Sequence, residues 1–369
     1  MRGNDLGKLI LVAPAAFKGS FGPRAVADAI AAGVRRAAPE ATVLLCPVAD
    51  GGDGLLDAVL PPGSLRERVE VSGPLGMPVA AELGWVDPET AILESSTACG
   101  LALLPPERRD PLRTTTRGVG DLLWEAVDRG ARTVVVGMGG SATVDGGTGA
   151  ARGFGWTFQD VGGAPLAEGG GALADLATWA SGWGLEAQVI ALADVTTPLL
   201  GPEGAAPVFG PQKGATPEAV ARLAAGLERL AGLMAAQGHP ELATLPGGGA
   251  AGGLGAGLVF FAGAQIVPGA AWVLDRVGFD AALAQAELVV TGEGALDRTS
   301  RVGKATGEVI RRAQAARKVV AVVAGRVDDG TGLAAYGGDG ATLDAAGIAT
   351  LAERATRDAL GLPASPAPS

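Results

Sequence analysis

Three glycine-rich segments and a fourth segment without glycine, each directly following a short apolar run, constrain this chain more than any other feature. They read VADGGDG from residue 48, GGSATVDGG from 139, LADVT from 192 and TGEGALD from 291, and each carries an acidic residue. Apolar runs that end in such turns and lead into helical patterns are typical of a parallel α/β sheet. Ligands of these sheets bind beyond the carboxyl ends of the strands. The four segments are therefore candidate parts of a binding site.

The expected elements alternate along the chain. The run LILVA from residue 9 is continuously apolar, which is typical of a strand buried on both faces. The runs at 67–71 and 79–86 flank a glycine- and proline-containing turn and are expected to pair antiparallel. We predict strands over 9–13, 41–48, 67–71, 79–86, 132–136, 287–291 and 318–324, and helices over 23–37 and 120–130.

Composition excludes several classes of function. The chain carries 39 acidic against 29 basic residues, a formal net charge of −10, which argues against nucleic acid or an anionic membrane as a partner. The single histidine, His239, excludes a histidine-rich metal site and most histidine-based catalytic triads. Cys46 and Cys99 lie far apart in the sequence, so we expect two buried, reduced thiols.

Two apolar stretches imitate membrane segments. The basic residues before LILVAPAAF give a weak likeness to a signal peptide, but the run is short and leads into FKGS, which favours a strand entering a functional loop. Residues 242–274 contain no charged residue, yet Pro246, Pro268 and three consecutive glycines interrupt them. We therefore expect a buried helix over 254–267 and a cytoplasmic protein.

The glycine-rich segments and the lysines together favour phosphoryl transfer. Backbone N–H groups of a glycine-rich turn cradle phosphate, nearby carboxylates suit a phosphate-bridging Mg²⁺, and lysines neutralise phosphate charge. Lys18, Lys213 and Lys304 each stand next to a glycine. The alternative is an ordinary α/β fold with Asp-capped turns and solvated lysines. Residues 247–252 fit GxGxxG without a preceding strand, and Gly303–Lys304 lacks the rest of a Walker A loop.

At the level of longer strings, the chain resembles the bacterial glycerate kinase family of the glycerate 2-kinase type. The likeness runs from about residue 9 to about residue 325 and follows the order of the family's motifs. The strings FGPQKGA from residue 209 and GGSAT from residue 139 are its most specific parts. The others are PVADGGDG from 47, TTT from 114, DV at 194, GAAGGLG from 249, TGEG from 291 and GK at 303.

The resemblance implies an activity and a domain organisation. The activity is the ATP- and Mg²⁺-dependent phosphorylation of D-glycerate to 2-phosphoglycerate, with D-glycerate and ATP as small-molecule partners and a homodimer as a possible assembly. The fold is two α/β domains. Residues 1–62 and 282–369 are expected to form a Rossmann-like domain with a mainly parallel sheet built from both chain ends, and residues 63–281 an inserted mixed α/β domain.

The mechanism suggested by this likeness assigns roles to four groups of residues. Asp194 accepts the hydroxyl proton or holds Mg²⁺, and Lys18 and Lys304 stabilise the transferring phosphoryl group. The residues placed with the ATP phosphates are Gly139, Gly140, Ser141, Ala142, Thr143 and Lys213. The residues placed with glycerate are Asp50, Gly51, Gly52, Arg113, Arg117 and Arg301, whose arginines are candidates for its carboxylate. Glu293 and Asp297 complete the metal ligands with Asp194.

The chain also departs from the family pattern. Ala15 and Ala16 stand where an Asp-Ser pair is usual, Ala295 replaces a common cation, and Thr299 begins a pair that replaces Gln-Thr. Asparagine is expected at Val144 and Thr197. Two further functions therefore stay open: a glycerate 3-kinase that forms 3-phosphoglycerate, and a catalytically impaired sensor of sugar acids or ATP. An NAD-dependent hydroxy-acid oxidoreductase is disfavoured, since no GxGxxG follows the first strand.

Overall fold

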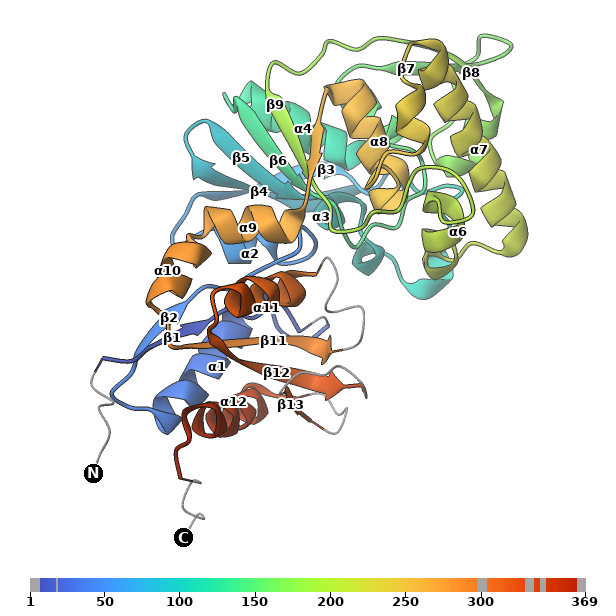
Figure 1. Cartoon of the computed structure of the whole chain (residues 1–369). Coiled ribbons are helices and arrows are strands. Elements are labelled where there is room, and N and C mark those ends of the chain that lie inside the picture. Colours follow the sequence, from blue (N-terminus) through green and yellow to red (C-terminus); the bar gives the residue numbers. More distant parts are fainter. Residues whose placement is uncertain (1–6, 18, 297–303, 329–334, 339–342, 364–369) are drawn as a thin grey trace. The chain divides into compact units, whose positions relative to one another are not determined.

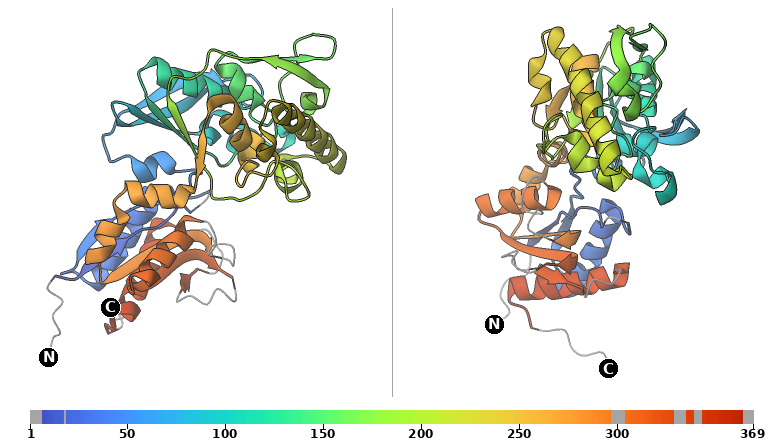
Figure 2. Two further views of the ribbon diagram at one scale, coloured as in Figure 1. Left: turned by 45° about the horizontal axis from the view of Figure 1, so that its top comes forward. Right: turned by 90° about the vertical axis from the view of Figure 1, so that its right-hand side faces the viewer.

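The fold was examined in a computed structural model, which describes residues 7–17, 19–296, 304–328, 335–338 and 343–363. Two compact units divide the chain (Figures 1 and 2). Unit 1 consists of residues 1–50, 57–61 and 269–369, and unit 2 of residues 51–56 and 62–268. The chain thus enters unit 2 from unit 1 and returns to unit 1 after Pro268.

Unit 1 is a three-layer α/β unit around a five-stranded sheet in the order β13-β12-β11-β1-β2, with every described pairing parallel. Helices α1 and α12 lie together on one face of this sheet, and α10 and α11 lie on the other (Figure 1). Its elements are β1 (Leu9–Val12), α1 (Pro23–Ala37), β2 (Thr42–Leu45), α9 (Gly269–Arg276), α10 (Phe279–Gln285), β11 (Leu288–Leu296), α11 (Ala305–Ala315), β12 (Val319–Val327), β13 (Ala335–Gly337) and α12 (Ala345–Leu360).

Strand β1 shows why a continuously apolar run forms the centre of this sheet. Ile10 and Val12 belong to the core beneath α1 and α12, whereas Leu11 belongs to the core beneath α10 and α11. Successive side chains of a strand point to opposite faces, so a strand covered on both faces needs apolar residues at every position. Helix α1 begins with Pro23 and presents a single apolar face to the sheet.

Unit 2 contains a six-stranded mixed sheet in the order β10-β9-β6-β5-β4-β3 and a two-stranded β7-β8 hairpin. Strands β5, β6, β9 and β10 run parallel, and β3 and β4 extend the sheet as an antiparallel edge. Its strands are β3 (Arg66–Ser72), β4 (Pro78–Asp87), β5 (Thr90–Glu94), β6 (Thr133–Gly137), β7 (Thr157–Asp160), β8 (Leu176–Ala180), β9 (Gln188–Leu192) and β10 (Gln265–Val267).

The helices of unit 2 enclose one large hydrophobic core. They are α3 (Ser95–Cys99), α4 (Arg117–Asp128), α5 (Thr148–Gly153), α6 (Ala205–Phe209), α7 (Pro217–Ala236) and α8 (Ala250–Ala262), and helix α2 (Leu55–Val59) crosses from unit 2 to unit 1. Among the described residues, no helix is long and apolar enough to span a membrane. Cys46 and Cys99 are buried free thiols, as expected.

Most expected elements are confirmed, with three corrections. The helix over 23–37 and the antiparallel pair at 66–72 and 78–87 form as expected. Helix α8 ends at Ala262, and Gln265–Val267 of the expected helix form strand β10 instead. Strand β11 continues to Leu296 because it pairs with β12 over its whole length, so TGEG is part of a strand rather than a turn after it. Strands β5, β7, β8 and β13 were not expected.

Candidate functional site

Glycine-rich segments meet at the carboxyl edge of the parallel strands in unit 2. Gly51 lies against Leu192 at the end of β9, where a Cβ atom on the glycine would be 2.7 Å from the leucine Cβ. A Cβ on Gly137 would be 2.5 Å from the Gly51 carbonyl oxygen, and one on Gly139 would be 2.6 Å from the Gly52 Cα. Real Cβ atoms do not fit at such distances, so this close backbone packing requires glycine on both segments.

The loop after β6 contains backbone amides that have no partner within the described part of the protein. Gly140 is exposed and adopts φ of +62°, and the Asp53 carboxylate and the Ser96 side chain lie next to it. The loop is anchored to the chain after α3, since Ala142 donates its N–H to the Cys99 carbonyl (2.8 Å) and Leu101 donates to the Gly140 carbonyl (2.8 Å). Within the described part of the chain, the N–H groups of Gly139, Gly140 and Ser141 have no protein acceptor. Such a cluster of unpaired amides suits an anion.

Lys213 supports this loop from beneath. Its Nζ donates to the Ser141 Oγ (2.9 Å) and to the Thr143 carbonyl oxygen (2.7 Å), and only 2% of the residue is exposed. Burial lowers the pKa of Lys213 to about 8. Among the described residues, no carboxylate lies within ion-pairing distance of its ammonium group.

The carboxylate of Asp145, in the same glycine-rich segment, is hydrogen-bonded mainly to backbone N–H groups. Its carboxylate accepts hydrogen bonds from the N–H groups of Thr116 (2.8 Å), Gly147 (3.1 Å) and Gly149 (3.2 Å) and from the Thr116 hydroxyl (2.9 Å). Burial raises the pKa of this carboxyl, and the Thr116, Gly147 and Gly149 donors act against that rise. Asp145 therefore joins the N-termini of α4 and α5 rather than facing a ligand.

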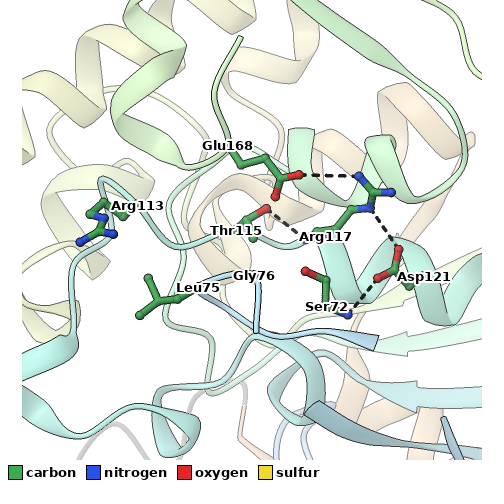
Figure 3. Close-up of a pocket in the computed structure, with 8 residues that line it drawn as sticks. All are labelled: Ser72, Leu75, Gly76, Arg113, Thr115, Arg117, Asp121 and Glu168. Carbon is green, nitrogen blue, oxygen red and sulfur yellow. Dashed lines mark hydrogen bonds and ion pairs between the residues drawn. The ribbon is translucent and has the colours of Figure 1, made fainter. Parts of the chain in front are cut away.

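A cavity of about 450 Å³ lies beside the N-terminus of α4 (Figure 3). Arg117 lies at one end, where its guanidinium contacts Asp121 (3.1 Å) and Glu168 (3.6 Å). Arg113 lies at the other end and points away from that cluster (Figure 3). In the described parts of the chain, the Arg113 guanidinium has no ion-pair partner. The other residues that line the cavity are Ser72, Leu75, Gly76 and Thr115.

The sheet of unit 1 contains a reversal of strand order, which is a second candidate ligand-binding position. Its strand order reverses between β1, which leads to β2 on one side, and β11, which leads to β12 on the other. Ala15 follows β1 and donates its N–H to the Gly292 carbonyl (2.8 Å), next to Glu293. Lys304 is the N-cap residue of α11 at the same edge. Parallel sheets bind ligands at such a reversal, outside the carboxyl ends of the strands.

The sequence-predicted residues are distributed over both units. Those in unit 2 are Gly51, Gly52, Arg113, Arg117, Gly139–Thr143, Asp194 and Lys213, and those in unit 1 are Asp50, Glu293 and Lys304. Lys18, Asp297, Thr299 and Arg301 lie outside the described residues. Of the expected metal ligands, Asp194 follows β9 and Glu293 lies within β11. No three His, Cys, Asp or Glu side chains in the described ranges form a group that could hold a metal ion.

Two polar residues at the loop, Ser95 and Ser96, were missed by reasoning from sequence, whereas Asp53 belongs to the predicted segment VADGGDG. Ser95 donates its hydroxyl to the Gly139 carbonyl (3.3 Å), while Ser96 and Asp53 lie beside Gly140. The available signal was the string AILESST from residue 91, an apolar run followed by polar residues. Glu94 in this string accepts hydrogen bonds from the Leu56 and Gly54 amides, which fixes the 51–56 segment at the sheet edge.

Comparison with known proteins gives a consistent result. A sequence model described as "Glycerate kinase family" matches residues 10–360. A glycerate kinase of Halalkalibacterium halodurans is 40% identical over 87% of this chain and 86% of its own length. The glycerate 2-kinase of Escherichia coli K12 is 39% identical over 88% and 87%. The crystal structure of a putative glycerate kinase 2 from Salmonella typhimurium LT2 superposes with a TM-score of 0.82 at 38% identity, covering 96% of this chain and 99% of that one.

Two α/β units with glycine-rich turns at the sheet edges, together with these matches, define a small-molecule kinase. The chain belongs to the glycerate kinase family. It is an enzyme that transfers a phosphoryl group to an alcohol group of glycerate, and membership of a kinase family implies the use of ATP.

Proposed function

We propose that this enzyme transfers the γ-phosphoryl group of Mg²⁺-bound ATP to the 2-hydroxyl of D-glycerate and releases 2-phosphoglycerate. The observation that carries the proposal is the Gly139–Ser141 loop at the carboxyl edge of the unit 2 sheet, whose three amides have no acceptor among the described residues. Phosphate binds to such clusters of amides. The choice of the 2-hydroxyl is supported by the 39% identical E. coli relative, which is named a glycerate 2-kinase.

The donor phosphates are proposed to bind to Gly139, Gly140 and Ser141. Ala142 and Thr143 belong to the support of the loop, because the Ala142 N–H is already donated to Cys99 and Thr143 is fully buried. Lys18 and Lys304 are proposed to neutralise the charge of the transferring group. Phosphoryl transfer depends mainly on positioning and electrostatic stabilisation, which amides and lysines supply.

The cavity at the N-terminus of α4 is proposed to bind glycerate. Arg113 is better suited to the carboxylate than Arg117, because two carboxylates already neutralise the Arg117 guanidinium. The Ser72 and Thr115 hydroxyls and the Glu168 carboxylate offer partners for the two hydroxyls of the substrate. Asp50, Gly51, Gly52 and Arg301 remain proposed substrate residues.

Mg²⁺ is proposed to bind together with the ATP phosphates. A phosphate-bound Mg²⁺ needs only one or two carboxylates from the protein, since water and phosphate oxygens complete its octahedron. Asp194 and Glu293, each at a strand of a parallel sheet, offer hard oxygen ligands that fit this requirement, with Asp297 as a third. The ion would neutralise phosphate charge. Asp194 would either hold this ion or orient the substrate hydroxyl and accept its proton.

One coupled assay tests the proposed reaction. The protein is incubated with Mg-ATP and D-glycerate, and the product is passed to enolase in the absence of phosphoglycerate mutase. We expect an enolase signal, because enolase consumes 2-phosphoglycerate only. ADP release without that signal would indicate 3-phosphoglycerate or uncoupled hydrolysis. Binding of ATP or glycerate without ADP release would support the sensor, with Ala15 and Ala295 as the responsible departures.

Replacing Asp194 tests its proposed role. We expect Asp194→Asn to lower kcat by about 100-fold or more, because the amide neither accepts the hydroxyl proton nor carries charge for a cation. Steady-state kinetics with D-glycerate and Mg-ATP measures the effect, and Asp175→Asn, at the exposed end of a 3₁₀ turn in unit 2, is the control. A kcat within twofold of wild type would remove Asp194 from the mechanism.

A further inference from the structure

Lys213 combines full burial with hydrogen bonds to two neighbouring positions of one loop. Its Nζ contacts the Ser141 hydroxyl and the Thr143 carbonyl, on either side of Ala142. The Ala142 N–H is itself bonded to the Cys99 carbonyl. The loop is therefore held from inside the unit at three consecutive residues, Ser141, Ala142 and Thr143. The amides of Gly139–Ser141 that lack an acceptor precede or begin this held segment.

The chain segment around Lys213 is shaped to point the side chain inward. Lys213 ends a 3₁₀ turn over Pro211–Lys213, and Gly214 follows with φ of +94°. A Cβ on Gly214 would lie 2.4 Å from the Arg109 carbonyl oxygen, so the turn requires glycine here. The ring of Phe209 lies 5.8 Å from the Nζ and covers another side of the ammonium group.

Burying an amine in this way is costly, and the two loop acceptors are what offset the cost. Desolvation disfavours the charged form, and the nearby groups that act electrostatically on Lys213 are Cys99 and Asp145. Asp145 is occupied by the helix N-termini, and neither group hydrogen-bonds to the Nζ in the described residues. An unpaired buried donor would be strongly unfavourable, so the loop conformation and the lysine stabilise each other.

We propose that Lys213 is a positioning residue, which fixes the Gly139–Ser141 loop from beneath so that its amides are organised for phosphate before the nucleotide binds. The Nζ does not contact the phosphate itself, because the loop that it supports covers it. A direct contact would require Lys213 to leave both Ser141 and Thr143. The expected loss of ATP affinity in Lys213 variants rests on the proposed function of the loop. The expected loosening of the loop in these variants does not depend on that function.

The experiment compares four variants of the full chain, namely three single substitutions and the double variant that combines Lys213→Met with Ser141→Ala. Lys213→Met removes both hydrogen bonds, and Ser141→Ala removes one of them while it retains the lysine. Lys318→Met is the matched control, since the Lys318 Nζ also donates to a backbone carbonyl, that of Ala284 (3.0 Å), but in unit 1. Amide hydrogen exchange of the peptide over 138–144 is measured without nucleotide. Calorimetry then gives the Kd for Mg-ATP, and kinetics gives KM for D-glycerate.

We expect Lys213→Met to accelerate exchange in this peptide by about tenfold without nucleotide, because the loop opens more often once its support is lost. The Kd for Mg-ATP should rise by about tenfold, whereas KM for D-glycerate should change less than about twofold. Ser141→Ala should shift both quantities in the same direction by less, and the double variant should be no worse than Lys213→Met alone. Lys318→Met should leave both unchanged.

Each other outcome overturns one part of the argument. Unchanged loop exchange with weakened ATP binding, or additive effects in the double variant, would contradict positioning and make Lys213 a direct phosphate ligand. Faster loop exchange with unchanged ATP binding would support positioning but overturn the proposed phosphate role of the loop. If Lys213→Met does not fold, the Ser141→Ala variant alone tests the proposal. Unchanged hydrogen exchange of the 138–144 peptide in that variant would contradict it.

Discussion

Asp145 is fully buried at the N-termini of helices α4 and α5 and accepts four hydrogen bonds from three residues. The Thr116 hydroxyl extends this arrangement, because it also accepts a hydrogen bond from the Ala150 amide (2.8 Å). One carboxylate thus satisfies donors that both helix ends would otherwise leave unpaired. Because Asp145 lies in a glycine-rich segment after a strand, the sequence alone made it a candidate binding-site residue.

We expect Asp145→Asn to destabilise the protein by about 2–4 kcal/mol, because the amide NH₂ group would face N–H donors that it cannot accept from. Thermal or urea unfolding measures the loss. Asp160→Asn is a suitable comparison, since the Asp160 carboxylate also accepts two backbone N–H groups, those of Gly162 and Ala164, but at an exposed turn. Equal effects of the two substitutions would contradict the importance of burial.

For individual residues, the sequence predicted which residue types follow the strands. It did not predict which of their side chains already hydrogen-bond within the protein. The strings GGSATVDGG and LADVT each offer one aspartate after an apolar run. Only the folded chain reveals that Asp145 is buried against two helix ends whereas Asp194 is partly exposed after β9. Burial depends on long-range packing, and a local pattern carries no information about it.

Among the elements, α1 and α12 approach each other unusually closely. A Cβ on Gly33 of α1 would lie 2.1 Å from the Ala349 carbonyl oxygen of α12 and 2.8 Å from the Glu353 nitrogen. Small residues at such a crossing let two helix backbones come together. Helix α12 is itself capped at both ends, since Asp344 accepts a hydrogen bond from the Gly347 amide (2.7 Å) at the start and Gly361 adopts the left-handed region at the end.

We expect Gly33→Ala to destabilise the protein by about 1–3 kcal/mol, although alanine is the better helix former by about 1 kcal/mol, because the added methyl group separates the helices. Gly232→Ala in α7 is the matched control, since nothing lies within 4 Å of its Cβ position. This control should be neutral or stabilising by up to about 1 kcal/mol. Chemical denaturation of both variants measures the difference, and a stabilising Gly33→Ala would contradict the close approach.

The lengths of elements were harder to predict than their types. Strand β11 extends through Gly292–Gly294, a string typical of a turn, because β12 offers a partner along its whole length. Conversely, the sequence predicted that the residues of β10 end a helix, but they form a strand because they pair with β9. Strand pairing is a tertiary effect, so propensity alone misplaced both boundaries.

At the level of the whole molecule, the units are interleaved in sequence. Unit 2 has its own core and includes the detached segment Gly51–Leu56. That segment supplies the Leu56 and Gly54 amides that hydrogen-bond to Glu94 and the Gly51 carbonyl that packs on Gly137. A fragment that omits it would leave Glu94 as a nearly buried carboxylate without these two donors.

We therefore expect a fragment of residues 50–268 to fold on its own and a fragment of residues 62–268 to be less stable by about 2–5 kcal/mol. Both fragments contain the complete six-stranded sheet, so the comparison measures the contribution of residues 50–61, which include the segment Gly51–Leu56. Circular dichroism during thermal unfolding and urea titration measures the difference. Equal unfolding midpoints would indicate that the segment contributes nothing to unit 2.

The interleaving also fixes an order of events during protein synthesis. Strand β1 is made long before its partner β11, which begins at Leu288, and before β12, which pairs with β11 and begins at Val319. Unit 2 is complete once Pro268 has been made, long before the central strand of unit 1 is paired on both sides. During that interval the newly made LILV strand has β2 but not β11 to pair with, and the apolar face of α1 lacks the rest of its sheet. The nascent chain therefore carries a finished domain behind an unfinished one.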